Sequence, residues 1–180
     1  MEREEALRIL DSYVANPNLK KHMLAVEAAV RFYAPLYGSD PDQWGIAGLL
    51  HDADWEKYPS EHPKVIIEDL RKRGVDKEIT QAIACHGNNF GVERKSQLDH
   101  VLFACDEITG LITATALVRP EKLTGLAASS VKKKMKIPTF AAGVNRQELQ
   151  QGADELDITL DEHMANVIEA MQEIQKELGL

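Results

Sequence analysis

The sequence is poor in cysteine and in basic residues, and each scarcity excludes a class of protein. Only two cysteines, Cys85 and Cys105, occur among 180 residues, without the Cys-x-x-Cys spacing of a metal site. Both fall in apolar stretches, so the sequence predicts buried, reduced thiols. Basic residues number 21 against 29 acidic residues, which gives a formal net charge of -8. General binding of DNA or RNA is therefore not expected.

Long apolar runs are also scarce. No stretch of the sequence looks long enough to cross a bilayer, so no membrane segment is expected. The first five residues, from Met1 to Glu5, are mostly charged and lack the apolar core of a secretory signal. The sequence therefore predicts a cytoplasmic protein. Its 180 residues, of which 44% are hydrophobic, suffice for one domain with a substantial core.

The adjacent pair His51-Asp52 is the first feature that indicates chemistry. It lies in the segment Leu-Leu-His-Asp-Ala-Asp, residues 49–54. An imidazole nitrogen and a carboxylate oxygen are ligands for a divalent ion of borderline softness. Adjacent residues diverge inside a helix, but they can converge on one ion where the chain turns out of the helix. The alternative for an isolated pair is that it caps the end of a helix or lies on the solvated surface.

Two further residues extend the pair into a pattern. His22 lies upstream and Asp106 downstream, each in helical surroundings. An unpaired carboxylate would be costly to bury in the apolar run around Asp106, and a metal ion compensates for that cost. A histidine, then His-Asp, then a distant aspartate resembles the HD superfamily of metal-dependent phosphohydrolases, over residues 19–119 or so. Residues 51–59, 106–110 and 117–120 are similar to short, stand-alone HD/HDIG-type hydrolases of undefined substrate.

The resemblance implies an all-α fold, the HD-domain helical bundle, and a divalent metal ion. The implied ligands are His22, His51, Asp52 and Asp106. Some members of the superfamily hold a second ion, and His62 and His86 occupy similar places in order; Asp52 would then bridge the two ions. The alternative for His62 is an ordinary residue near a helix start, because Pro63 fits a first helical turn.

The resemblance does not identify the metal. Mn, Fe, Co, Ni, Zn and Mg all remain candidates, with one or two ions per chain. Zinc held through Cys and His is another alternative, because Cys85 and Cys105 each adjoin a proposed ligand.

The chain departs from many HD hydrolases directly after the pair. Trp55 stands where those proteins have a lysine. We expect Lys57 to contact phosphate or donate a proton, and Asp54 to orient a water or act as a general base, so that Asp52, Asp54 and Lys57 form the catalytic set. Arg119 is a second candidate for binding phosphate oxygens. The alternative for Asp54 and Lys57 is a polar loop.

These residues predict hydrolysis of a small phosphoester, such as a nucleotide or a related metabolite. A bound metal ion makes a water molecule more acidic and neutralises charge on phosphate oxygens. The basic segment 119–136 suits a small anionic substrate, although it can equally be a solvated helix face. Two alternatives remain, namely an HD-type di-iron oxygenase with the same ligand set and a non-catalytic, metal-binding regulatory domain. The full ligand set argues against the last.

Apolar residues recur at three- and four-residue spacing along the whole chain, which predicts helices throughout. The expected helices cover residues 2–14, 19–37, 41–52, 63–73, 76–86 and 96–120, with a loop at 88–95. Shorter helices follow, broken at Gly125, Pro138 and Gly143.

A last helix is expected from Thr159, where Thr-Leu-Asp-Glu matches a capping box. Its apolar stripe, from Leu160 to Leu178, predicts either packed core or the face of a homodimer. We expect one domain over residues 1–180, with a metal-site core at about 19–119 and a helical extension at 120–180. His100 and His163 show no partner pattern and are expected at the surface.

Overall fold

The computed structural model describes residues 1–180, and its regular structure is entirely helical. The ten α-helices and two 3₁₀ helices are α1 (Arg3–Tyr13), α2 (Pro17–Tyr33), η1 (Ala34–Tyr37), α3 (Pro41–Leu50), α4 (Lys64–Lys72), α5 (Lys77–Ala84), η2 (Asn88–Phe90), α6 (Gln97–Leu117), α7 (Ala128–Met135), α8 (Arg146–Glu155), α9 (Leu160–Glu173) and α10 (Gln175–Leu178). The predicted all-α fold is confirmed.

Local sequence signals explain most helix boundaries and two differences from the expected ranges. The Asn16 side chain caps α2 and Pro17 opens its first turn, so α2 begins before the expected residue 19. The chain does not continue as one α-helix to residue 37. Pro35 has no N–H to donate to an earlier carbonyl, and residues 34–37 form η1 instead.

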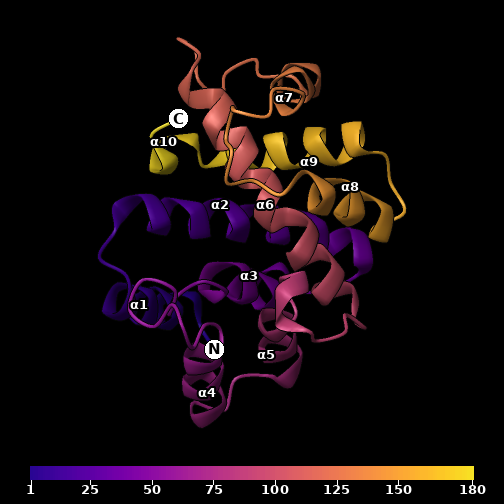
Figure 1. The fold of residues 1–180 in the computed structure, drawn as a ribbon. Coiled ribbons are helices and arrows are strands. Elements are labelled where there is room, and N and C mark those ends of the chain that lie inside the picture. The colour runs from indigo at the N-terminus through magenta and orange to yellow at the C-terminus, as the bar shows by residue number, and fades with distance from the viewer.

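Helix α6 runs through most of the height of the molecule in Figure 1. It lies against α5 near one end and α7 near the other, and α2, α3, α8 and α9 also pack on it. In the same view α1, α3, α4 and α5 occupy the lower half, while α7 to α10 occupy the upper half. One hydrophobic core of 45 buried residues extends from Ala6 to Leu178. The apolar stripe of α9 belongs to this core, so it is not an open dimer face.

The composition of α6 corrects one expectation. This helix of 21 residues is long and apolar enough to cross a membrane, judged by length and composition alone. Its most apolar stretch of 18 residues has a mean hydropathy of 1.3. The expectation that no stretch reaches this length is therefore wrong. The packing supplies another reason for the composition, because a helix surrounded by other helices is apolar around most of its circumference. In this structure 61% of that stretch is buried.

Helices α2 and α3 cross at very short range, and glycine makes this possible. A Cβ atom on Gly48 would lie 2.9 Å from the backbone N and Cα of Glu27. Any larger residue at this position would push the helices apart. The crossing brings His51, at the end of α3, beside His22 of α2, with 5.3 Å between the ring centroids.

Candidate metal centre

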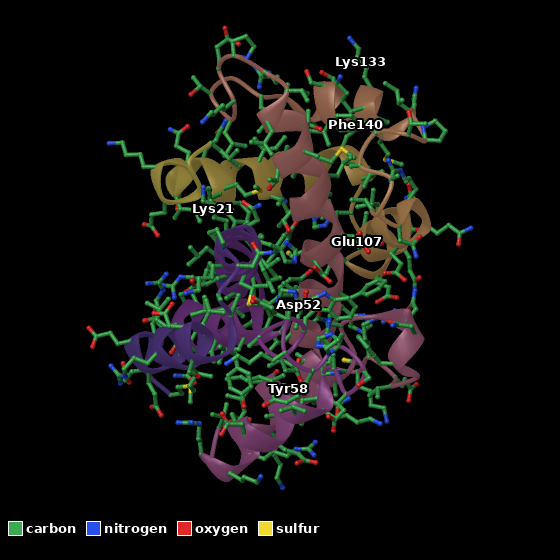
Figure 2. All side chains as sticks on the ribbon, turned by 60° about the vertical axis from the view of Figure 1, so that its left-hand side comes forward. Lys21, Asp52, Tyr58, Glu107, Lys133 and Phe140 are labelled. Atoms are coloured by element: carbon green, nitrogen blue, oxygen red, sulfur yellow. The ribbon has the colours of Figure 1, made fainter.

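Four histidines and two aspartates from separate parts of the chain meet at one place. Asp52 lies near the middle of the molecule (Figure 2). The contributing residues are His22 on α2, His51 and Asp52 at the end of α3, His62 before α4, His86 after α5, and Asp106 on α6. All six predicted metal ligands are therefore brought together.

The first group surrounds Asp106. Its Oδ1 lies 3.0 Å from His22 Nε2 and 3.4 Å from His51 Nε2. The other carboxylate, Asp52, places Oδ2 3.6 Å from the same His51 nitrogen. Two ligand atoms at right angles around one ion, each about 2.1 Å from it, would lie about 3.0 Å apart. The spacing of this group is thus close to what a shared ion requires.

The second group surrounds the other oxygen of Asp52. Asp52 Oδ1 lies 3.2 Å from His62 Nε2 and 3.4 Å from His86 Nε2. The rings of His62 and His86 have centroids 5.2 Å apart. Asp52 therefore faces one group with each oxygen, which is the arrangement expected of a bridging carboxylate. Ligation by these residues remains a prediction, and the geometry is compatible with it.

The hydrogen bonds on the far side of three rings show that this donor set suits a cation. Nδ1 of His51 and of His86 lies 2.8 Å and 2.6 Å from the backbone carbonyls of Gly48 and Ile83. Nδ1 of His62 lies 2.7 Å from Asp54 Oδ1. Because these oxygens only accept, each Nδ1 carries the proton, and a neutral ring then points the lone pair of Nε2 at a carboxylate.

Two lone pairs facing each other need a cation between them. His51 Nε2 is completely buried and has no hydrogen-bond partner in the protein. A buried polar atom without a partner is costly, and a metal ion at this position would satisfy it. The residues present therefore fit a divalent metal ion.

The electrostatics of the cluster lead to the same conclusion. Burial lowers the pKa of His51, but Asp52 and Asp106 outweigh it and raise that pKa to about 9. Burial likewise opposes ionisation of Asp52, yet His51 and His86 lower its pKa to about 2. Burial also raises the pKa of Asp106, and His51 and His22 bring it well below its usual range. The carboxylates thus stay ionised and attract positive charge, which a proton or a metal ion supplies.

The expected role of Asp54 as a general base needs correction. Its side chain is completely buried, and Oδ2 accepts a hydrogen bond from the backbone N–H of Ile66 at 2.9 Å. The other oxygen accepts from His62 Nδ1. Both oxygens are occupied and neither faces the space between the ligands. Asp54 is placed to hold the ring of His62, and it is not placed to activate a water.

The expected phosphate contacts of Lys57 and Arg119 also need correction. Lys57 Nζ donates to the backbone carbonyl of Ser12 at 2.5 Å, so the ammonium is directed at the end of α1. The guanidinium of Arg119 donates to the carbonyls of Lys122 and Thr124 at 2.8 and 3.3 Å. Arg119 also follows the end of α6, about 20 Å along the helix direction from Asp106 at 1.5 Å per residue. Neither cation lies at the cluster.

Two aromatic rings that the sequence did not single out for the site pack on its second group. Phe90 contacts His62 and His86, with centroids 5.3 and 4.8 Å apart. Trp55 packs edge-on against His62 at 5.2 Å and remains 50% exposed. The two rings shield His62 from water. In the sequence Trp55 stands out only as a departure from a motif, and no local signal marks Phe90.

The segment that carries Phe90 is fastened to α8. Arg94 donates to both carboxylate oxygens of Glu155, at 2.8 and 2.7 Å, and its guanidinium stacks on the ring of Phe103. The same guanidinium donates to the carbonyl of Cys85 at 3.2 Å and to Asn88 Oδ1 at 3.0 Å, on either side of His86. The helical extension therefore helps to position a predicted metal ligand.

The two cysteines belong to the packed interior and not to the metal centre. Cys85 and Cys105 are buried, and burial raises the pKa of both thiols, that of Cys85 to about 12. Neither joins the ligand groups, so the alternative of zinc held through cysteine has no support in the geometry.

His163 and His100 were expected at the surface, and this is wrong for His163. It is completely buried between Tyr33 Oη, 2.7 Å from Nδ1, and the carbonyl of Ala104, 2.9 Å from Nε2. Burial lowers its pKa to about 4. His100 is partly buried and pairs with Glu155 at 2.7 Å.

Comparison with known proteins agrees with this geometry. The model of the HD domain family matches residues 19–111, which is more than half of the chain and includes all six residues of the cluster. No curated protein and no solved structure matches the chain. The chain therefore belongs to the HD domain family, whose superfamily consists generally of metal-dependent phosphohydrolases.

Proposed function

We propose that the protein is a metal-dependent phosphohydrolase that acts on a small phosphoester, with water adding to phosphorus as the ester P–O bond breaks and an alcohol leaves. The observation that carries this proposal is the pair of His/Asp groups that share Asp52. Metal ions held there would polarise phosphate oxygens and make a bound water more acidic.

The chain's own residues prepare such a site. The carbonyls of Gly48 and Ile83 and the carboxylate of Asp54 hold three imidazoles with Nε2 facing the carboxylates. The side chains of Asp52, Asp106 and His22 remain 19%, 22% and 25% exposed, so the cluster is open to solvent at these three residues. A phosphoester can approach there while Phe90 and Trp55 cover His62.

Metal content and phosphate release test the proposal together. The wild type, reconstituted with Mn²⁺ and dialysed, should retain two ions and release phosphate from a panel of nucleotides and phosphorylated metabolites. Asp52→Ala should lose metal and reduce turnover by more than about 100-fold, because it removes the residue that both groups share. Asp11→Ala is a matched control, since that carboxylate is exposed on α1 and pairs with Lys20.

The result that refutes the proposal is a reconstituted wild type that binds no metal, or Asp52→Ala that keeps its metal. Metal bound without turnover of any phosphoester would favour a regulatory domain. Far-UV circular dichroism shows whether each variant keeps its helices.

One observation favours the di-iron oxygenase as a second candidate. Neither Lys57 nor Arg119 lies at the cluster, so the cations expected to hold phosphate are missing from it. Oxygen uptake by protein loaded with Fe²⁺, compared with protein loaded with Mn²⁺, distinguishes this alternative. Uptake that depends on iron and on an organic substrate would favour the oxygenase.

A further inference from the structure

A cavity of about 330 Å³ adjoins the metal centre at His22. Its walls are formed by Asn18, Lys21 and His22 of α2, by Gly110, Thr113 and Leu117 of α6, and by residues 178–180. We call it the His22 cavity. Its volume lies at the small end of the range for ligand pockets, about 300–1,000 Å³, so it suits part of a small metabolite.

The His22 cavity lies along the face of α6 that also carries Asp106. Asp106, Gly110, Thr113 and Leu117 follow one another at spacings of four, three and four residues, which places them on the same side of the helix. Thr113 is about 10 Å from Asp106 along the helix axis. A molecule whose phosphate group lies at an ion held by Asp106 can therefore extend its remaining atoms past His22 into the cavity.

Lys21 supplies an unpaired cation to this cavity. It forms no ion pair and no hydrogen bond with the protein, and its ammonium lies against Gly179, 2.9 Å from where a Cβ atom would be. Its neighbours differ in this respect. Lys20 pairs with Asp11 at 2.6 Å, and Lys122 donates to the carbonyl of Gly179 at 2.6 Å. Figure 2 shows Lys21 beside the C-terminal helices, above Asp52.

Part of the cavity wall is apolar. Leu117 is 62% exposed, although it is a large hydrophobic side chain at the end of the core helix. It lines the cavity together with Leu178. An apolar group bound against Leu117 would remove this surface from water, which favours binding. The cavity thus offers a cation, an apolar wall and a metal ligand to one molecule.

We propose that the His22 cavity holds the part of the substrate that does not react, and that Lys21 binds a second anionic group on it. The inference rests on the proposed phosphoester hydrolysis and names the substrate class of that site. The substrate is a small phosphoester with a short apolar body and a second anion, which is a carboxylate or a phosphate.

Binding of non-hydrolysable analogues to the metal-loaded protein tests the inference by isothermal titration calorimetry. Benzylphosphonate, 4-(phosphonomethyl)benzoate and 1,4-xylylenediphosphonate share one body and one phosphonate, and they differ in the second group. We expect the last two to bind about tenfold more tightly than benzylphosphonate, as one charge-assisted hydrogen bond provides. The tighter of the two identifies the second anion as carboxylate or phosphate.

Three variants assign the preference to Lys21. Lys21→Met should bind all three analogues equally, with its metal content and its affinity for benzylphosphonate unchanged. Lys21→Arg should keep the preference, because the positive charge remains. Lys20→Met is the matched control and should behave as the wild type, since that ammonium is already paired with Asp11.

Equal binding of the three analogues by the wild type, or a preference that survives in Lys21→Met, would overturn the inference. Either result leaves the proposed function intact if the wild type binds metal and releases phosphate. Failure of the proposed function is recognised separately, by the absence of metal or of phosphate release.

Discussion

Replacing Asp54 by Asn alters the hydrogen bonding behind the second group without changing the size of the side chain. The carboxylate is completely buried and accepts from His62 Nδ1 at 2.7 Å and from Ile66 N at 2.9 Å. An asparagine retains one accepting oxygen and replaces the other with a donating NH₂ group. In either orientation of the amide, one of the two donors faces another donor.

The size of the effect follows from this loss. A buried donor without a partner costs about 1–3 kcal/mol, so the free energy of unfolding of metal-free Asp54→Asn should fall by about 2 kcal/mol. The variant also loses the carboxylate that fixes the His62 tautomer and increases its basicity. Loss of such a partner lowers metal affinity by about 10–100-fold. The effect should fall on the ion bound by His62 and His86, while the ion bound by His22 and Asp106 keeps its affinity.

Equilibrium dialysis against a series of free Mn²⁺ concentrations, followed by elemental analysis, measures the two affinities. The wild type should fill two sites, and Asp54→Asn should fill the second only at 10- to 100-fold higher Mn²⁺. Glu61→Gln is a matched control, because this exposed acid adjoins His62 in sequence and its side chain makes no hydrogen bond. Two ions bound by Asp54→Asn with wild-type affinity would refute the reasoning that Asp54 orients His62.

Three further perturbations have defined outcomes. Gly48→Ala separates α2 from α3, and should lower the free energy of unfolding in urea by roughly 1–3 kcal/mol and weaken metal binding; unchanged values would show that the helices move apart at no cost. Arg94→Met leaves the carboxylate of Glu155 without its main partner and should cost about 3 kcal/mol, while elemental analysis should show loss of the ion near His86 before the other. Burial raises the pKa of Glu155, but Arg94 and His100 outweigh it and lower that pKa from 4.5 to about 2. Its contribution is therefore present above pH 4.5 and lost as the pH falls toward 2, so the stability difference between wild type and Glu155→Gln should shrink from pH 7 to pH 3.

The helices and the ligand pattern could be predicted from the sequence because their signals are local or ordered along the chain. Helical periodicity placed nearly every element, and the order of His22, the His51-Asp52 pair and Asp106 identified the cluster. The partners of the polar residues after the pair could not be predicted. Lys57 turns to Ser12, 45 residues earlier, and such a contact leaves no trace in local spacing.

Contacts between residues far apart in the sequence also decide the surroundings of His163, which was expected at the surface. His163 bonds to Tyr33, 130 residues away, and to the carbonyl of Ala104, so its burial depends on the packing of three helices. The spacing places His163 on the apolar side of α9, three residues after Leu160 and four before Val167, but the groups that its ring nitrogens contact lie on other helices. Phe90 is a comparable case, because its contact with His62 depends on where Arg94 fixes the loop.

The six residues of the candidate metal centre come from separate segments between residues 22 and 106, and only the folded chain brings them together. An unfolded chain does not present this ligand set, so a metal ion bound to the native state would shift the folding equilibrium by mass action. The added stability grows as RT ln(1 + [M]/Kd), about 2.7 kcal/mol when the free metal exceeds Kd by 100-fold. The free metal concentration would thus shift the folded fraction of the protein, and with it the fraction that proteases can reach.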